Sequence, residues 1–536
     1  MLRDYQQRAL SLLYGWFREG NKGNPCLMLP TGSGKSHIIA ALCQDALRNW
    51  PGTRILMLTH VRELIGQNAA KLRAHWPNAP MGIYSSGMRQ RRLGEPITFA
   101  GVQSVHSRAG QIGHIDLCLI DECHLVDTKN QGRYRELIDA LLAINPSMRV
   151  IGLTATPWRL GHGRIDSGDN SLFDDLIEPV TIEELIHKGH LAPLHSKHTD
   201  TELSTKGVHK RGGEYIAGEL ERAVDTVELN RSISEEIIAR AGERKAWLLF
   251  CSGVEHAQHM ADELTEHGIT AACITGKTPS GERDRIIERF KSGEIRALTN
   301  AQVLTTGFDY PDIDLIAMIR PTMSATLYVQ MAGRGMRPKS HTDHCLVLDF
   351  AGNVRQHGPI TAVQAPDAKA GDGEAPVKAC PQCDELVHLS LRHCPGCGYE
   401  FERATAKDGP KLYGDDIMGL SDHVMAVGSW SWRSHTSKSS GKDMVKVTYY
   451  PEDLSGKPVT EYLPVMHGGL AGQRAVSRLV EIAKESGASL PQGNCSMWEL
   501  AESMQAGAPP NQIHYRMEGK WPRVEYRQWE SNDEVA

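Results

Sequence analysis

The sequence lacks a long apolar run. No stretch approaches the roughly 18 consecutive apolar residues that a membrane-spanning helix needs. Residues Met1 to Tyr5 also lack the basic start and apolar core of a secretory signal peptide. We therefore predict an intracellular protein with no membrane partner.

The sequence also lacks a large net charge and the closely spaced cysteines of a disulfide-rich domain. The formal net charge is −6, which argues against a surface that coats nucleic acid throughout but leaves room for a local basic channel. The 12 cysteines are spread over 536 residues, and four of them form two CxxC pairs, which favours metal binding over disulfides. Because a single core stops growing at about 250–300 residues, several domains are expected.

Short apolar runs alternate with helix-like segments, as in repeated βα units. Such runs are typical of parallel strands covered on both faces, so two α/β domains of similar size are expected. The runs lie at 25–30, 54–59, 117–120 and 149–154, then at 246–250, 272–275, 297–299, 315–319 and 345–348. Residues 365–376 have linker composition, and beyond the CxxC pairs a strand at 445–450 and a helix at 470–486 predict a small α+β module.

A glycine-rich segment follows the first apolar run and opens a helix-like segment, as a phosphate-binding loop does. Its residues are Thr31, Gly32, Ser33, Gly34, Lys35 and Ser36. Lys35 would reach the β- and γ-phosphates, and the Ser36 hydroxyl would bind Mg²⁺. Leu29 replaces the first glycine of the usual pattern, which leaves a glycine-rich surface turn as the alternative.

A second motif ends the apolar run at 117–120 with Asp121 and Glu122. Asp121 can hold Mg²⁺ from the side opposite Ser36, and Glu122 can polarise the attacking water as a general base. A lone Asp-Glu pair is usually a solvated loop, but this pair follows a strand too apolar for the surface. Together the two motifs predict a nucleoside triphosphatase.

The order of further motifs resembles superfamily 2 DEAD/DEAH-like helicases over roughly residues 1–355. The segments that carry the resemblance are 2–7, 30–36, 59–64, 101–104, 121–124 (Asp-Glu-Cys-His), 153–157, 250–252, 303–309 and 330–337. The resemblance implies two tandem RecA-like domains, at 1–197 and 231–362, joined by a connector at 198–230. After a linker at 363–376, we expect a zinc ribbon at 377–404 and a C-terminal α+β domain at 412–536.

The resemblance also assigns residues to ATP, which would bind between the two domains. Gln6 would read the adenine edge with Arg3 nearby, and Asp309 and Gly307 would contact the nucleotide from the second domain. Arg334 and Arg337 would be arginine fingers, and Gln330 would position the water. Phosphate contacts with nucleic acid are expected from Thr59, His60, Arg62, Gln103, Ser104, Ser252, Thr299, Thr305 and Thr306.

Within superfamily 2, segments such as 274–279, 348–353 and 516–521 resemble the bacterial RadD DNA-repair ATPase family, and a phage helicase of that type fits as well. That resemblance implies single-stranded or branched DNA as substrate, single-strand-binding protein or a recombinase as partner, and a bacterial cytoplasm. An RNA helicase and a DNA-stimulated scaffold that does not unwind are the alternatives.

Cys380 and Cys383 form one CxxC pair, and Cys394 and Cys397 form the other. Two such turns can form a tetrahedral Zn²⁺ site. Because four thiolates leave no open coordination position, such a site would be structural rather than catalytic. A redox pair is the alternative. Further along, Trp430 and Trp432 beside basic residues could stack bases, or could anchor a hydrophobic core.

Overall fold

The computed structural model divides into two compact units. The first consists mainly of Met1–Leu176 and Leu185–Leu389, and the second mainly of Ile177–Glu184 and Leu420–Ala536. The residues whose structure is described are 2–126, 132–159, 163–168, 170–301, 303–305, 308, 310–361, 363, 377–379, 382, 386–388, 423–437, 441–453, 457–467, 469–491, 495–518 and 521–529.

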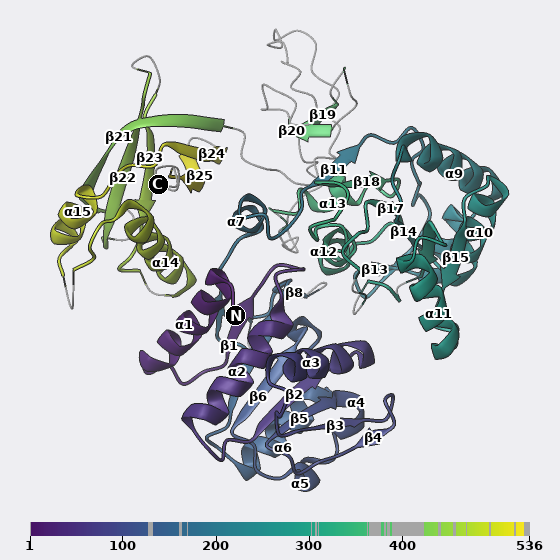
Figure 1. Cartoon of the computed structure of the whole chain (residues 1–536), viewed down its shortest axis with the longest axis horizontal. Coiled ribbons are helices and arrows are strands. Elements are labelled where there is room, and N and C mark those ends of the chain that lie inside the picture. Colours follow the sequence, from purple (N-terminus) through teal and green to yellow (C-terminus); the bar gives the residue numbers. More distant parts are fainter. Residues whose placement is uncertain are drawn as a thin grey trace. The chain divides into compact units, whose positions relative to one another are not determined.

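An eight-stranded sheet forms the first lobe of the first unit, in the order β10-β1-β7-β6-β2-β5-β3-β4 (Figure 1). The pairs from β1 to β3 in that order are parallel, and their strands are almost fully buried, as the apolar runs predicted. The strands are β1 (Pro25–Met28), β2 (Ile55–Thr59), β3 (Met81–Ser85), β4 (Gln90–Arg91), β5 (Ile97–Gly101), β6 (Leu117–Asp121), β7 (Arg149–Thr154) and β10 (Asp175–Ile177). The helices are α1 (Asp4–Arg18), α2 (Lys35–Asn49), α3 (Arg62–His75), α4 (Val102–Val105), α5 (Ala109–Ile112), η1 (Cys123–Leu125) and α6 (Arg133–Ile144), and a hairpin joins β8 (Trp158–Arg159) to β9 (Gly163–Arg164).

A six-stranded parallel sheet forms the second lobe, in the order β11-β18-β17-β14-β16-β15. Its strands are β11 (Leu194–Lys197), β14 (Trp247–Cys251), β15 (Ala271–Ile274), β16 (Ala297–Asn300), β17 (Leu315–Ile319) and β18 (Cys345–Asp349). Its helices are α9 (Val227–Ala241), α10 (Val254–Glu266), α11 (Ser280–Lys291), α12 (Ala325–Gly333) and α13 (Asn353–His357). Between β11 and α9 lie the hairpin β12 (Lys210–Arg211) and β13 (Glu214–Tyr215) and the helix α8 (Ala217–Val224), while α7 (Ile182–His187) precedes β11.

The boundary expected at residue 197 lies too far along the chain. Strand β11 pairs in parallel with β18, from Leu194 opposite Cys345 to Lys197 opposite Leu348, so it belongs to the second sheet. The error has a physical reason, since only alternate residues of this edge strand are buried and it therefore gives no continuous apolar run. The chain changes from one sheet to the other before Leu194.

The second unit contains a five-stranded antiparallel sheet, in the order β23-β22-β21-β24-β25, and two helices. The strands are β21 (His423–Thr436), β22 (Asp443–Pro451), β23 (Val459–Leu463), β24 (Gln512–Glu518) and β25 (Trp521–Gln528), and the helices are α14 (Gly469–Ser486) and α15 (Met497–Gln505). Trp430 and Trp432 are each only 5% exposed and lie in its core with Tyr449. Of the two roles weighed for these tryptophans, the structure supports the hydrophobic anchor.

A short hairpin pairs β19 (Val377–Ala379) with β20 (Leu386–His388). The predicted zinc ligands Cys380, Cys383, Cys394 and Cys397 lie outside the described residues. Within the described part of the chain, every helix is too short or too polar to span a bilayer.

Candidate functional site

The phosphate-binding loop connects β1 to α2 and needs its glycines. Gly34 is the N-cap of α2 with φ 84°, and Gly32 has φ 86°, both in the left-handed region that favours glycine. A Cβ at Gly34 would also lie 2.8 Å from Nε2 of Gln6. Since α2 begins at Lys35, the unpaired N–H groups of its first turn face the loop, as in anion-binding helix starts.

Leu29 explains why this motif departs from the usual pattern. Its side chain is fully buried, and its N–H donates to the carbonyl of Thr154 at 2.9 Å, which extends the pairing of β1 with β7. Leu29 is therefore a core residue that precedes the loop. The loop itself starts after Pro30, so a surface turn is excluded.

The two acidic residues lie at the end of β6, opposite the loop. The Nζ of Lys35 lies 3.3 Å from Oε1 of Glu122, and Nδ1 of His124 lies 3.4 Å from Oε2. Burial opposes ionisation of Glu122, but Lys35 and His124 outweigh it and hold the pKa of this carboxyl below its usual value. Glu122 is thus ionised at neutral pH and able to accept a proton.

Asp121 has a different environment. Burial raises the pKa of Asp121 to about 6, and the Glu122 carboxylate adds to this shift. Its Oδ2 accepts a hydrogen bond from Nδ2 of Asn68 at 2.9 Å, and its Oδ1 accepts one from the N–H of Glu122 at 3.0 Å. No sequence pattern indicated Asn68, a buried amide on α3.

These residues fit a divalent cation. A positive ion beside Asp121 would favour the charged form that burial disfavours, and Ser36 lines the same pocket. Ser33 Oγ is buried without a hydrogen-bond partner, so it can serve a bound group. Among the described residues, His, Cys, Asp and Glu do not gather in threes as in an all-protein metal site. Ser36 and Asp121 therefore suit Mg²⁺, which takes its remaining ligands from phosphates and water.

The N-terminus of α1 is tied to the same loop. Nε2 of Gln6 donates to the carbonyl of Ser33 at 3.1 Å, and its Oε1 accepts from the N–H of Arg3 at 3.0 Å. The hydroxyl of Tyr5 donates to the same Ser33 carbonyl at 2.6 Å, a contact that sequence reasoning missed. Gln6 and Tyr5 thus fix the loop, while Arg3 and Gln6 both line the pocket.

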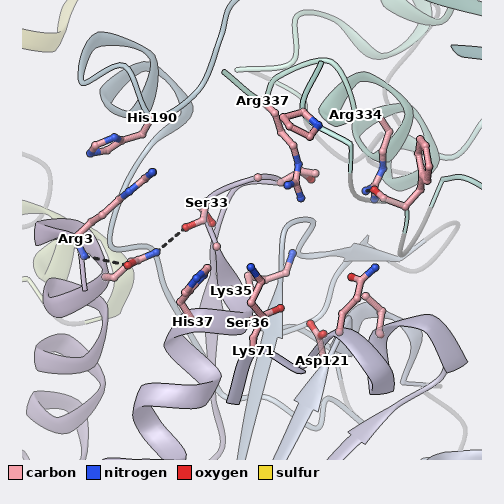
Figure 2. A pocket seen from close by; sticks show the side chains of 18 of the residues that line it. Arg3, Ser33, Lys35, Ser36, His37, Lys71, Asp121, His190, Arg334 and Arg337 are labelled. Atoms are coloured by element: carbon pink, nitrogen blue, oxygen red, sulfur yellow. Dashed lines mark hydrogen bonds between the residues drawn. The ribbon is translucent and has the colours of Figure 1, made fainter. Parts of the chain in front are cut away.

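Side chains from both lobes line this pocket, whose volume is about 490 Å³ (Figure 2). In Figure 2, Arg3 and His190 lie at one end, Lys35 and Ser36 in the middle, and Arg334 and Arg337 on the side of the second lobe. The volume suits a ligand of nucleotide size. Lining residues that the sequence did not single out include His37, Leu64, Gln67, Lys71, His190 and Phe308.

The two predicted arginine fingers are held differently. The guanidinium of Arg334 donates through Nη2 to the carbonyl of Thr305 at 2.7 Å and through Nη1 to the carbonyl of Phe308. Arg334 therefore also braces the loop after β16. Gln330 is not among the side chains that line the pocket. Gly307 and Asp309 lie outside the described residues.

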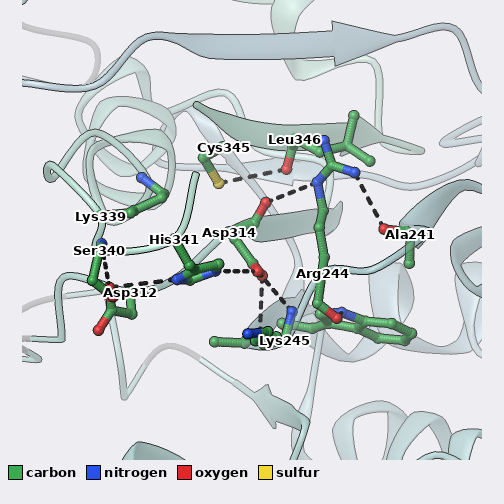
Figure 3. A network of polar contacts seen from close by, with 12 residues as sticks. Ala241, Arg244, Lys245, Asp312, Asp314, Lys339, Ser340, His341, Cys345 and Leu346 are labelled. Carbon is green, nitrogen blue, oxygen red and sulfur yellow. Dashed lines mark hydrogen bonds and ion pairs between the residues drawn. The ribbon is translucent and has the colours of Figure 1, made fainter. Parts of the chain in front are cut away.

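Arg337 has a backbone support of its own. The Nζ of Lys339 donates to the carbonyl of Gly335 at 2.6 Å and to that of Arg337 at 2.8 Å. The next residues anchor this lysine, because Ser340 donates to Asp312 at 2.9 Å and His341 lies 2.7 Å from the buried Asp314 (Figure 3). The loop that carries Arg337 is thus tied to the segment that precedes β17.

Comparison with known proteins gives the family. Residues 1–159 match the family model described as the res subunit of type III restriction enzymes, and residues 229–339 match the model described as the helicase conserved C-terminal domain. A protein of Saccharomyces cerevisiae named as a candidate ATP-dependent helicase, IRC3, is 30% identical over 367 residues, which cover 66% of this chain and 52% of that protein. The chain belongs to superfamily 2 of the helicases. It is an ATP-hydrolysing enzyme.

Two further relatives show how widely this helicase core occurs. A 51.5 kDa protein of a Lactococcus phage is 28% identical over 380 residues, which cover 69% of the helicase and 77% of the phage protein. The DNA 3′-5′ translocase XPB2 of Sulfurisphaera tokodaii is 24% identical over 377 residues, which cover 63% of this chain and 79% of the translocase. The helicase spans about half the length of the yeast relative. The resemblance to the RadD family stays a prediction.

The predicted nucleic-acid contacts of the first lobe fall into two groups. His60 and Gln103 are exposed, with their Nε2 atoms 3.3 Å apart, and Ser104 Oγ accepts from the N–H of Ser86 at 3.0 Å. Arg62 is exposed and donates to Ser280 Oγ at 3.5 Å. Thr59 is only 1% exposed. The first four remain candidates, whereas Thr59 is a core residue.

The second lobe requires similar corrections. Thr299 is fully buried and its hydroxyl donates to the carbonyl of Ala257 at 2.6 Å. Ser252 is 4% exposed and donates to the carbonyl of Ile319 at 3.1 Å. Because both hydroxyls serve the protein's own backbone, we no longer assign them to phosphates. Thr305 is 6% exposed, and Thr306 lies outside the described residues.

Proposed function

We propose that this helicase couples ATP hydrolysis to movement along DNA. The observation that carries the proposal is the pocket, which combines Lys35 and Glu122 of the first lobe with Arg337 of the second. A nucleotide held by both lobes favours their closed arrangement, and hydrolysis removes part of that attraction. A cycle of closing and opening can advance the two lobes along a strand.

The residues of the pocket divide the hydrolytic work. Lys35 and the N–H groups at the start of α2 bind the phosphates, and Glu122 accepts a proton from the attacking water. Arg337 stabilises negative charge that develops on the γ-phosphate. Ser36 and Asp121 would hold Mg²⁺, which would neutralise phosphate charge. Arg3 and Gln6 hold the base end of the nucleotide.

DNA is the substrate that we favour over RNA. One relative is named as a DNA translocase, and the match covers 63% of this chain. A phage protein is among the relatives, so phage replication stands beside DNA repair and recombination as the setting. We place the activity in a bacterial cytoplasm, with single-strand-binding protein or a recombinase as partner.

We also propose that Cys380, Cys383, Cys394 and Cys397 hold one structural Zn²⁺. The support is their spacing, together with the antiparallel pairing of Ala379 with Leu386, since the first CxxC pair lies in the segment that joins these strands. Four thiolates leave no open position for catalysis. This module would order the chain between the helicase core and the second unit.

One set of assays tests the proposed function. ATPase rates are measured with no nucleic acid, single-stranded DNA, branched DNA and RNA, and strand displacement is followed on the same substrates. We expect stimulation by DNA above RNA, together with strand displacement or displacement of a bound protein. Stimulation by RNA alone would establish the RNA helicase alternative. Stimulation by DNA without any displacement would establish the scaffold alternative.

A further inference from the structure

The segment between β11 and α9 carries an exposed positive surface. Its hairpin joins β12 to β13 through Gly212 and Gly213, whose φ values of 62° and 84° allow a tight two-residue turn. Lys210 and Arg211 are exposed on this hairpin, Lys206 is exposed just before it, and Arg222 is exposed on α8. We call these four residues the hairpin cations. No ion pair of theirs is found in the described part of the chain.

Four carboxylates of the same segment are engaged in contacts within the protein. Glu214 accepts hydrogen bonds from the Thr322 hydroxyl at 2.6 Å and from the N–H of Met323 at 3.0 Å. Glu221 accepts from the N–H groups of Glu255 and His256 at 3.0 and 3.2 Å. The remaining two are paired as well, Glu219 with His209 at 2.9 Å and Glu202 with Arg355 at 3.0 Å.

The hairpin cations therefore outnumber the one carboxylate beside them, Glu219, which lines the same pocket as Lys206 and Arg222. Lys210 lies over the Tyr215 ring and Arg222 Nε donates to the carbonyl of Gly218, but all four cations remain exposed. In a chain of net charge −6, four exposed cations on one short segment form a local exception. An anionic partner would gain attraction there without displacing an internal carboxylate. Within the segment Glu219 pairs with His209, whereas the hairpin cations form no ion pair among the described residues.

The anchors also fix where the surface lies. Glu255 and His256 begin α10 directly after β14, and Thr322 follows β17, so both contacts are at the carboxyl ends of parallel strands. Ligands of open α/β sheets bind at that edge, and the loop after β16 with Thr305 ends there too. Figure 1 shows β13 beside the second sheet.

We propose that the hairpin cations bind the phosphate backbone of the DNA strand on which the helicase moves. The inference rests on the proposed function, because it adds a phosphate-binding element to the second lobe. It also supplies contacts there that the buried Ser252 and Thr299 cannot make. The contacts are to phosphates, so they would carry no sequence preference.

The experiment compares two variants of the full chain with the same change of charge. In the first, Lys206, Lys210 and Arg211 are replaced by Gln. The control carries Arg18→Gln, Lys22→Gln and Arg48→Gln, three exposed cations of the first lobe; Arg18 and Arg48 end α1 and α2, far from the helix starts at the pocket. Binding of a fluorescent oligothymidylate is measured over a series of salt concentrations, and thermal unfolding checks the fold of each variant.

A plot of log K for DNA binding against log salt concentration has a negative slope. For each phosphate contact that the hairpin variant loses, the slope should become less steep by about 0.7, or by about 2 for three contacts. That change corresponds to roughly 100-fold weaker binding at 0.1 M salt. The control variant should keep the wild-type slope. Equal slopes for the two variants, with tight binding by the wild type, would overturn the proposal.

A second measurement needs no variant. Lysines of the wild-type protein are acetylated with and without oligothymidylate, and the sites are quantified by mass spectrometry. DNA should protect Lys206 and Lys210 but not Lys22, and equal protection of all three would refute the assignment. A wild-type protein that binds RNA but no DNA would refute the proposed function. The salt dependence of RNA binding by the same two variants would then still show whether the hairpin cations contact phosphates.

Discussion

Lys339→Met should slow ATP hydrolysis without weakening ATP binding. The Nζ of Lys339 donates to the carbonyls of Gly335 and Arg337 at 2.6 and 2.8 Å, and burial lowers the pKa of this lysine. Methionine keeps most of the aliphatic stem but removes both donors. The carbonyls on either side of the loop that presents Arg337 then lose their common anchor.

The magnitude follows from two considerations. A hydrogen bond from a charged donor contributes about 1.5–3 kcal/mol, and the support of Arg337 combines two such bonds. An arginine finger contributes about 10³- to 10⁵-fold to turnover, and a shift of about 1 Å can cost about 100-fold. We therefore expect kcat to fall about 10- to 100-fold, which is about 1.4–2.7 kcal/mol of the barrier. KM for ATP should change less, because the finger acts chiefly in the transition state.

Steady-state ATPase of four proteins gives the answer: wild type, Lys339→Met, Arg337→Ala and the double variant. If Lys339 acts through Arg337, its substitution should add little to the loss caused by Arg337→Ala. Lys339→Arg should restore part of kcat, and Lys291→Met, an exposed lysine 3.0 Å from Glu288, should have no effect. If Lys339→Met lowers kcat by the same factor in the wild type and in Arg337→Ala, Lys339 does not act through Arg337.

Three more predictions concern the remaining parts of the site. Glu122→Gln should keep ATP binding while turnover falls at least about 100-fold, since the general base is lost; near wild-type turnover in a single-turnover assay would contradict this role. Arg334→Ala should lower both turnover and the thermal unfolding midpoint, because Arg334 also donates to the carbonyls of Thr305 and Phe308. Arg337→Ala should lower turnover alone. Equal unfolding midpoints for the two variants by scanning calorimetry would argue against a stabilising role of these hydrogen bonds of Arg334. Elemental analysis should find about one Zn²⁺ per chain, lost in Cys394→Ser with basal hydrolysis retained, and metal-free wild-type protein would remove the zinc site.

Local patterns predicted the parallel sheets and the central part of the pocket. Continuous apolar runs became buried parallel strands, and the glycine-rich loop and Asp121-Glu122 meet at their carboxyl ends. These features depend on neighbours in sequence, because strand burial and helix starts are local.

The features that were missed depend on contacts between distant residues. Asn68 supports Asp121 from a helix 53 residues earlier, and Tyr5 reaches the Ser33 carbonyl across 28 residues. A single amide or phenol leaves no periodic signal. Strand β11 was assigned to the wrong lobe for the same reason, since its pairing with β18 joins segments about 150 residues apart. Motif position also does not reveal where a hydroxyl points, and the hydroxyls of Thr299 and Ser252 donate to backbone carbonyls of the protein itself.

Glu122 shows how chemistry can oppose the stability of this fold. It is one of two non-glycine residues with positive φ in the described part of the chain, at 50°. A side chain in that conformation costs about 1 kcal/mol, which glycine would avoid. Selection of variants for heat resistance alone would thus weigh the relief of this strain against the loss of the ion pair with Lys35, and would take no account of the general base. Engineering of a more stable form of the helicase must therefore exempt this residue from any search that scores folding without turnover.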